Sequence, residues 1–441
     1  MRVLLIYPSS AIELTHPEYV GSLAEPLALE YLSATAKADQ HDVMLLDLRL
    51  NPNSLLLTLK QFDPDLVCLT GLSMHVLTIL RIVRTIKLYN SACRIMVGGH
   101  HATVMPEDYY VPEIDYIVKG LGISQLSDVL KAMDQGNENT IDIPGVYRQT
   151  GDLNFSYGGP INSFSLDELP LPDRKLNGMN PSSYYICNIG QVSLLRTSVG
   201  CTYHCNFCAL WRVTGGKYYV HSISRVIQEL ELIQSPNVFI ADDESFVKPE
   251  RMIKLATAIR LAGIQKQYYA CLRLDSLLNH PDVVRAWVDI GLRWIYVGVE
   301  AVSSSRLSAF NKKLTLDTIE RGLKLAMNMG LEVFSGFIVH TDFTRQDFKE
   351  LSRFIEHNKL QYPLFSILTP LPGTPSLKSF NSISYLQANG RPNWDRFDLQ
   401  HPVTKTRLPE TEFMQAFQTL RKTFCFTTFF KNHKNVLSTR G

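Results

Sequence analysis

Short apolar runs alternate with stretches of helical spacing along most of this 441-residue chain. In the first part the apolar runs lie at residues 3–7, 41–48, 65–70, 94–97 and 114–118. Short strands joined by helices form parallel sheets that are covered on both faces. Residues 1–140 are therefore predicted to be a doubly wound α/β (Rossmann-like) domain, which binds ligands beyond the C-terminal ends of its strands.

The same alternation resumes at residue 191. Apolar runs follow at residues 192–199, 238–241, 268–274, 294–299, 332–339 and 364–369. Six strand–helix units are fewer than the eight of a closed barrel, so residues 191–375 are predicted to be a partial (β/α)6 barrel. The Pro- and Gly-bearing residues 141–190 are predicted to be a linker. Residues 376–441 are expected to form a C-terminal helical extension, and a chain of this length is expected to have more than one domain.

Three cysteines, Cys201, Cys205 and Cys208, stand in the spacing C-x3-C-x2-C just after the first of these barrel runs. Thiolates on one short loop can hold three irons of a [4Fe–4S] cluster and leave the fourth iron open to a substrate or cofactor. Barrels of this kind carry their chemistry at the C-terminal ends of their strands. A zinc knuckle or three buried thiols are the alternatives, although zinc prefers four ligands and no second cysteine pair lies nearby.

The spacing, with the aromatic Phe207 before the last cysteine, resembles the signature of the radical S-adenosylmethionine (SAM) superfamily. The resemblance implies that Cys201, Cys205 and Cys208 are the catalytic cluster ligands and that SAM chelates the open iron. The reduced cluster then cleaves SAM to a 5′-deoxyadenosyl radical. An electron donor such as flavodoxin or ferredoxin is implied as a partner.

The resemblance also implies a SAM pocket at the strand ends. Asp242 and Asp243 occupy the position where relatives contact the SAM amino group. Arg273 is expected to bind the SAM carboxylate through its forked donors. Glu300, in a Gly-x-Glu pattern, is expected to contact ribose or the amine, and Leu368 lies in the segment that flanks adenine. A solvated acidic loop and a structural ion pair of the arginine are the alternatives.

The N-terminal domain resembles the cobalamin-binding domain that precedes many radical SAM modules. In that domain a serine-bearing loop and a Gly-Gly turn hold the nucleotide tail, and Ser73, Gly98 and Gly99 match them. Three features depart from the pattern. Ser73-Met-His75 replaces Ser-x-Leu, Gly120-Leu-Gly122 replaces Gly-Glu-Gly-Glu, and the Asp-x-His-x-x-Gly motif that supplies a lower cobalt ligand in methionine synthase is absent. Tight turns in a domain without cobalamin are the alternative, so cobalamin is expected as a cofactor on the resemblance alone.

The whole pattern is similar to cobalamin-dependent radical SAM methyltransferases, and to the hopanoid methylases among them. It implies methylation of an unactivated carbon of a small-molecule or lipid-like substrate. Two alternatives remain open: a radical SAM rearrangement, cyclisation or oxidation without cobalamin methyl transfer, and a non-catalytic iron–sulfur or cobalamin-binding sensor.

Composition sets the remaining expectations. A formal net charge of +2 provides no basic surplus for a nucleic-acid backbone. The sequence contains no apolar run long enough for a transmembrane helix. Eight cysteines, three of them in one motif, indicate a reducing compartment, so a cytoplasmic location is expected.

Overall fold

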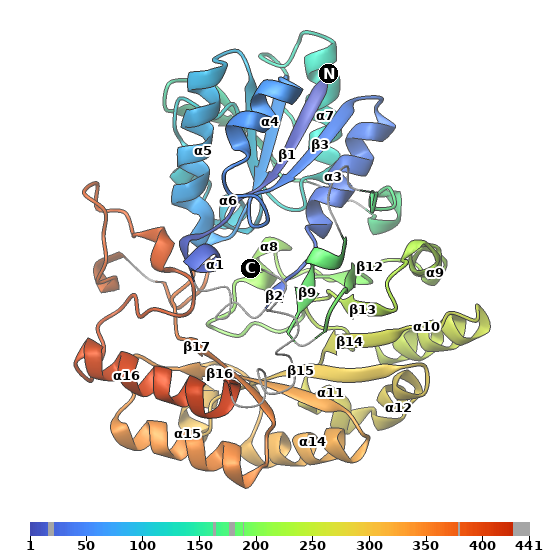
Figure 1. The fold of residues 1–441 in the computed structure, drawn as a ribbon, viewed down its shortest axis with the longest axis vertical. Helices are drawn as coiled ribbons and strands as arrows, with labels where there is room; N and C mark the ends of the chain where they lie inside the picture. The colour runs from blue at the N-terminus through green and yellow to red at the C-terminus, as the bar shows by residue number, and fades with distance from the viewer. Residues whose placement is uncertain (16–21, 162–164, 176–180, 188, 378–379, 427–441) are drawn as a thin grey trace. The chain divides into compact units, whose positions relative to one another are not determined.

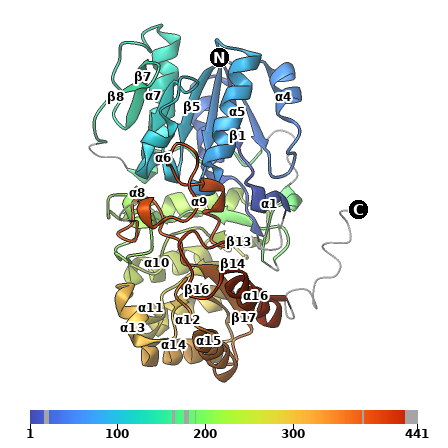
Figure 2. The same ribbon diagram turned by 90° about the vertical axis from the view of Figure 1, so that its left-hand side faces the viewer.

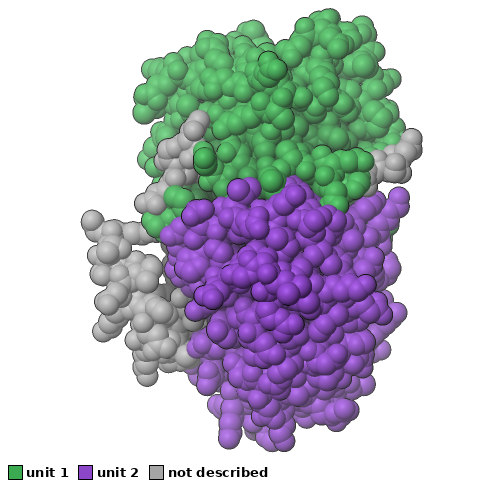
Figure 3. Space-filling model, turned by 90° about the vertical axis from the view of Figure 1, so that its right-hand side faces the viewer, with its two compact units in different colours: residues 1–184, 212–215 green, residues 185–211, 216–441 purple. Residues whose placement is uncertain are grey.

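The structure, a computed structural model, describes residues 1–15, 22–161, 165–175, 181–187, 189–377 and 380–426. The chain divides into two compact units, coloured separately in Figure 3. The first unit comprises residues 1–184 and 212–215, and the second comprises residues 185–211 and 216–441.

The first unit contains a seven-stranded sheet in the order β3-β1-β4-β5-β6-β7-β8 (Figure 1). The strands are β1 (Arg2–Tyr7), β3 (Asp42–Asp47), β4 (Leu66–Thr70), β5 (Arg94–Gly98), β6 (Tyr116–Val118), β7 (Val146–Gly151) and β8 (Asn154–Tyr157). The first five are parallel. Their order changes direction between β1 and β4, the switch point beside which doubly wound sheets bind ligands.

Helices follow the strands of the parallel part of this sheet. They are α1 (Ala11–Thr15), α3 (Leu27–Ala38), α4 (Leu55–Phe62), α5 (Val76–Tyr89), α6 (His100–Val104) and α7 (Ile123–Asp134). Consecutive side chains Val3, Leu4, Leu5 and Ile6 of β1 are all fully buried. Neighbouring strand residues point to opposite faces, so both faces of the sheet are covered. The predicted doubly wound α/β fold is confirmed.

The segment expected to be a linker, residues 141–190, does more than connect two domains. Its strands β7 and β8 form an antiparallel hairpin that extends the first sheet (Figure 2). The rings of Tyr147 and Tyr157 stack across this hairpin with centroids 4.5 Å apart. The first unit then continues to Tyr184. Some of the Gly and Pro residues that suggested an open linker therefore mark tight turns of an ordered region.

The second unit contains six parallel strands whose order in space follows the chain, β10-β13-β14-β15-β16-β17. They are β10 (Ser193–Leu195), β13 (Asn237–Ile240), β14 (Gln267–Cys271), β15 (Leu292–Glu300), β16 (Glu332–Val339) and β17 (Tyr362–Ile367). The main connecting helices are α9 (Ile223–Leu232), α10 (Pro249–Leu261), α11 (Leu274–Asn279), α12 (Pro281–Asp289), α13 (Ser304–Ala309), α14 (Leu316–Asn328) and α15 (Arg345–His357). Parallel strands in sequential order confirm the partial (β/α)6 barrel.

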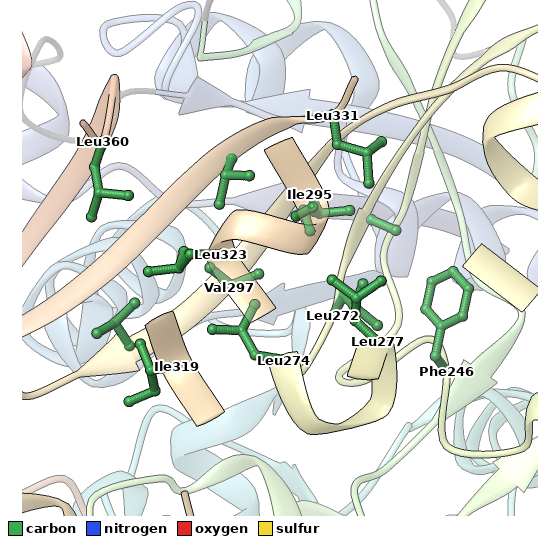
Figure 4. Close-up of a cluster of buried hydrophobic side chains, with 14 of the residues drawn as sticks. Phe246, Leu272, Leu274, Leu277, Ile295, Val297, Ile319, Leu323, Leu331 and Leu360 are labelled. Atoms are coloured by element: carbon green, nitrogen blue, oxygen red, sulfur yellow. The ribbon is translucent and has the colours of Figure 1, made fainter. Parts of the chain in front are cut away.

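The core of the second unit lies between the outer face of this sheet and its helices. Figure 4 shows Ile295 and Val297 of β15 beside Leu323 of α14 in one apolar cluster. Fully buried Phe413 and Phe417, from α16 (Glu410–Arg421), belong to the same cluster, so the C-terminal extension is part of this unit. Alternation along β15 turns its other side chains to the inner face.

Small residues leave room on that inner face. Gly298 and Gly336 are paired in register on β15 and β16. A Cβ atom on Gly336 would lie 2.1 Å from the Tyr296 hydroxyl. A side chain there would displace the tyrosine, so glycine is required for the phenol to lie across the strand.

Within the described residues, every helix is too short or too polar to cross a membrane.

Candidate functional site

The three cysteines lie on one loop after the first strand of the second sheet. The chain runs from β10 into the short strand β11 (Ser198–Val199), which pairs antiparallel with β12 (Tyr219–Val220). Cys205 is buried, Cys201 and Cys208 are partly buried, and all three are free thiols. The structure therefore places the motif at the strand end that the sequence predicted.

Hydrogen bonds from the segment after α13 fix the cysteine loop. The Asn206 backbone N–H donates to the Phe310 carbonyl at 3.0 Å, and the Asn311 side-chain amide donates to the His204 carbonyl at 3.0 Å. The ring of Phe207 packs edge-to-face on Phe310 with centroids 4.9 Å apart. Phe207 thus anchors the loop to the barrel.

The three thiols are largely withdrawn from water, and charged groups lie near them. Burial is the largest cause that raises the pKa of each thiol, to about 12 for Cys208. Cys205 further raises the pKa of Cys201, and both raise that of Cys208, so the three lie within electrostatic range of one another. The cations of Lys312 and Arg273 act in the opposite direction on Cys205. Thiolates here would need further positive charge, such as iron provides.

These features fit a cluster better than a single ion. In the described ranges no set of three or more His, Cys, Asp and Glu side chains has the arrangement of a metal-ion site. A [4Fe–4S] cluster carries its irons at separate corners, so its cysteines need not converge on one point. Three soft thiol donors on one loop, close enough to influence one another, match that requirement.

Two of the acidic residues after β13 support the loop backbone. Buried Asp242 accepts from the backbone N–H groups of Thr197 and Ser198 at 2.7 and 2.9 Å, and from the Thr197 hydroxyl at 2.6 Å. Asp243 accepts from the Gly200 N–H at 2.8 Å, directly before Cys201. Both carboxylates therefore position the start of the cysteine loop, rather than forming a solvated acidic loop.

Arg273 follows β14 and is already engaged within the protein. Its Nε and Nη2 atoms donate to the two Asp275 carboxylate oxygens at 3.0 and 2.9 Å, and Nη2 also donates to the Lys312 carbonyl at 3.0 Å. The guanidinium lies 3.7 Å from the ring centroid of Tyr203 in the cysteine loop. This geometry favours the structural ion pair that the sequence left open as the alternative.

Glu300 ends β15 in a strained conformation with a buried cation beside it. Its φ of 67° lies in the left-handed region, which non-glycine residues rarely adopt. The Glu300 carboxylate accepts from Lys312 Nζ at 3.0 Å, and both residues are buried. A Cβ atom on Gly298 would lie 2.1 Å from Glu300 Oε1, which explains the Gly-x-Glu pattern. No sequence pattern indicates Lys312, because its partner lies twelve positions away across a loop and α13.

Leu368 and a histidine that the sequence did not suggest lie at the last two strand ends. The Leu368 N–H donates to the Val339 carbonyl at 2.9 Å, and its side chain packs on the core. His340 lies between the rings of Phe310 and Phe343, and its buried Nε2 atom has no hydrogen-bond partner. Burial, aided by a nearby arginine, lowers the pKa of His340 to about 4, so the imidazole is neutral at pH 7.

In the first unit the predicted cobalamin residues lie at the C-terminal ends of β4 and β5. Gly99 has a φ of 97°, and a Cβ atom on it would lie 2.6 Å from Thr70 Oγ1 and 2.8 Å from Gly71 N. This glycine is therefore required by the close approach of two loops. A Cβ atom on Gly98 would meet only Val118 at ordinary contact distance, 3.7 Å. The two glycines thus have different roles.

The serine loop of this unit contains one buried histidine, His75, and contacts a second, His101 of α6. Buried Ser73 lies within hydrogen-bonding distance of His101, with Oγ and Nδ1 3.0 Å apart. His75, at the position of the expected leucine, is fully buried; its Nδ1 accepts from the Leu72 N–H at 3.0 Å, and its Nε2 lies 2.9 Å from Glu13 Oε2. The departure from Ser-x-Leu therefore keeps a buried side chain and adds hydrogen bonds that fix the loop. An ordered loop after β4, beside the switch point, and a close glycine turn after the neighbouring strand β5 fit a bulky ligand such as cobalamin.

Two family models match the chain. One, for the radical SAM superfamily, covers residues 195–355, and the other, for the B12-binding domain, covers residues 18–130. The first range includes the cysteine loop, and the second includes the loops of Ser73 and Gly99. The chain is a radical SAM protein with an N-terminal B12-binding domain. This combination confirms the family predicted from the sequence, and it implies a [4Fe–4S] cluster, SAM and cobalamin as cofactors.

Relatives of this radical SAM protein share nearly its whole length. It is 29% identical over 423 residues to the hopanoid C-3 methylase of Methylococcus capsulatus, covering 94% of this chain and 78% of that protein. It is 27% identical to an uncharacterized methyltransferase of Pyrococcus horikoshii, covering 96% of this chain and 92% of that protein. The solved structure of TsrM from Kitasatospora setae, a radical SAM methyltransferase with cobalamin and a [4Fe–4S] cluster bound, shares the fold. Its TM-score is 0.69 at 20% identity, and the match covers 85% of this chain and 76% of that one.

Proposed function

We propose that this radical SAM protein is a cobalamin-dependent C-methyltransferase that methylates an unactivated carbon of a small-molecule or lipid-like substrate. The observation that carries the proposal is the cysteine loop at the end of β10, held against cationic Lys312 and Arg273 in a chain that also has a B12-binding domain. The resemblance to a hopanoid C-3 methylase along 94% of the chain supports methyl transfer and an apolar substrate.

When bound, the three cofactors supply a 5′-deoxyadenosyl radical from reductive SAM cleavage and a methyl group for transfer. The chain's own part is to hold and orient them. Cys201, Cys205 and Cys208 ligate three irons, and Phe207 keeps the loop against the barrel. The cations of Lys312 and Arg273 offset the negative charge of the thiolates. A one-electron donor such as flavodoxin or ferredoxin is the proposed partner.

For SAM we propose acceptors from two strand ends. Asp243 and Glu300 are the proposed acceptors for the SAM amine and ribose, and the backbone at Leu368 is proposed to flank adenine. Asp242 and Arg273 are proposed to act as positioning residues, because their polar atoms hold the cysteine loop and its flanks. The forked donors of Arg273 are engaged by Asp275, so we no longer assign it the SAM carboxylate.

For cobalamin we propose the loops of Ser73 and Gly98-Gly99 at the end of the first sheet. No protein side chain is proposed as a lower cobalt ligand, because the histidine motif for that role is missing from the sequence. Bound cobalamin should therefore show a base-off spectrum. Gly98, where an added side chain meets no close neighbour, is the position to block; Gly99 is needed by the fold itself.

The test is anaerobic reconstitution of the full chain with iron, sulfide and cobalamin, followed by SAM and a reductant. The proposal predicts four irons and one base-off cobalamin per chain, and formation of 5′-deoxyadenosine. With SAM labelled in its methyl group and a hopanoid as the first substrate to try, product mass should rise by one labelled methyl group. Cys208→Ala should abolish 5′-deoxyadenosine formation, while Cys93→Ala, a buried free cysteine outside the loop, should not.

Three outcomes separate the alternatives. Stoichiometric zinc without iron would overturn the cluster. Cleavage of SAM without any methylated product, across hopanoid and other lipid substrates, would favour rearrangement or oxidation. A loaded cluster that releases no 5′-deoxyadenosine would indicate a sensor.

A further inference from the structure

Three polar residues of the first unit form a buried hydrogen-bonded chain. Ser73 Oγ lies 3.0 Å from His101 Nδ1, and His101 Nε2 lies 2.9 Å from Asp108 Oδ2. His101 is fully buried, and the Ser73 residue and the Asp108 side chain are each 5% exposed. The ring of Tyr109 packs edge-on against His101 with centroids 5.7 Å apart. The three residues come from different turns: after β4, within α6, and within the 3-10 turn Pro106–Tyr109.

The chemistry of these three side chains determines the direction of the hydrogen bonds between them. An ionised carboxylate only accepts, so the Nε2 atom of His101 must carry a proton and donate it to Asp108. In a neutral imidazole the other nitrogen, Nδ1, is then an acceptor. With His101 neutral, the Ser73 hydroxyl donates to Nδ1, and this hydrogen bond fixes the rotation of the hydroxyl. Its oxygen lone pairs are the part of Ser73 left to meet another group.

The burial of this hydrogen-bonded triad of Ser73, His101 and Asp108 calls for an explanation beyond packing. Taking a carboxylate and an imidazole out of water costs free energy unless their hydrogen bonds are made, and an apolar pair of similar size often serves stability as well. Here the buried pair terminates at one hydroxyl, on the serine loop at the switch-point edge of the sheet. A single oriented hydroxyl contributes little to a core, but it determines how a ligand is held.

We propose that His101 and Asp108 are positioning residues that orient the Ser73 hydroxyl toward the nucleotide tail of cobalamin. This inference rests on the proposed function, which assigns the tail to the Ser73 loop. His101 and Asp108 touch the cofactor only through Ser73. They act on the tail and not on the corrin ring.

The test compares two ligands that differ in the tail alone. Cobalamin and cobinamide, which lacks the nucleotide, are titrated into the full-length protein, and binding is followed by the corrin absorption spectrum. One hydrogen bond of ordinary strength corresponds to roughly a 3- to 10-fold change in affinity. Ser73→Ala, His101→Phe and Asp108→Leu should each weaken cobalamin binding by about this factor. Each should leave cobinamide binding unchanged, which also reports that the variant is folded.

A double variant provides the second measurement. If His101 acts through Ser73, the Ser73→Ala/His101→Phe pair should bind cobalamin no more weakly than the worse single variant. His401→Gln, which alters a partly buried histidine–aspartate pair with Asp398 in the second unit, is the matched control and should change neither affinity.

The outcomes are distinct. Equal losses of affinity for cobalamin and cobinamide, or additive losses in the double variant, would overturn this inference. They would mean that the three hydrogen-bonded residues only support the fold. Cobalamin affinity unchanged in His101→Phe would overturn it too, while leaving the proposed function intact. A wild-type protein that binds neither ligand would refute the cobalamin part of the proposed function and this inference with it.

Discussion

Replacing Lys312 with methionine should destabilise the second unit strongly, because it leaves the Glu300 carboxylate buried without its cation. The two side chains are 8% and 11% exposed, and their charged atoms are 3.0 Å apart. At an effective dielectric constant of about 20, the attraction over that distance is roughly 5 kcal/mol. Methionine keeps the length and apolar stem of lysine, and the Lys312 carbonyl that accepts from Arg273 is unaffected.

The net loss of stability should be smaller than this attraction, because the Glu300 carboxylate can take up a proton and become neutral. Removing one partner of a buried ion pair typically costs 3–5 kcal/mol. Protonating an ordinary glutamate at pH 7 costs about 3.7 kcal/mol, which is 2.7 units at about 1.4 kcal/mol per unit. A larger penalty would be relieved by proton uptake, so the loss should level off at about 3–4 kcal/mol. Near pH 5 proton uptake is easier, and the loss should fall to about 1 kcal/mol.

Urea unfolding of cluster-free protein, followed by tryptophan fluorescence, measures this loss in the relevant unit. All four tryptophans of the chain, at positions 211, 287, 294 and 394, belong to the second unit. The control is Arg321→Met, which breaks the Arg321–Asp317 pair on α14, where the side chains are 67% and 72% exposed. Such an exposed pair contributes under about 1 kcal/mol. Losses of equal size in the two variants, or a Lys312→Met loss that does not change with pH, would refute the reasoning.

Three further predictions concern two buried titratable groups and the glycine turn of the first unit. Burial raises the pKa of Glu244 to about 7. The stability of the cluster-free protein should therefore fall as pH rises from about 4.5 to 7. Glu244→Gln should remove that fall and gain up to about 3 kcal/mol at pH 8, as measured by urea unfolding. The lowered pKa of His340, about 4, has the opposite consequence: stability is lost as pH falls from about 6.5 toward 4, and His340→Phe should flatten that acid limb in the same assay. Gly99→Ala should destabilise the first unit by about 1–3 kcal/mol, and Gly98→Ala by much less, as read from hydrogen exchange of β4 and β5 peptides. Unchanged pH profiles, or equal exchange in the two glycine variants, would contradict these assignments.

The architecture was predictable because it depends on patterns that are local in sequence. Apolar runs of strand length, separated by helical spacing, indicated both sheets, and the observed β16 (Glu332–Val339) has the predicted bounds. Short elements were missed where the pattern is weak. The hairpin of β7 and β8 carries Gly and polar residues that also occur in linkers, and the five-residue helix α6 is too short to show a period.

Partnerships between side chains were the part that sequence could not provide. Residue type and strand-end position indicated that Arg273 lies beside the cysteine loop, but nothing local shows that Asp275 would engage its forked donors. Lys312 and His101 find their partners through loops whose course depends on the whole fold. A buried charge acquires its role from its neighbours, so the same residue type fits a ligand contact or a structural pair until those neighbours are known.

The acidic run after β13 shows how the two roles coexist. Three adjacent carboxylates would repel one another strongly unless each had its own donors. Asp242 has the Thr197 and Ser198 N–H groups, and Asp243 has that of Gly200. Glu244 accepts from the Arg273 N–H at the longer distance of 3.3 Å and from the Phe246 backbone, and burial outweighs both bonds and raises its pKa to about 7. The two aspartates therefore fix the backbone that leads to Cys201. Burial raises the pKa of both Asp242 and Glu244, that of Glu244 to about 7, so the glutamate can exchange a proton near neutral pH.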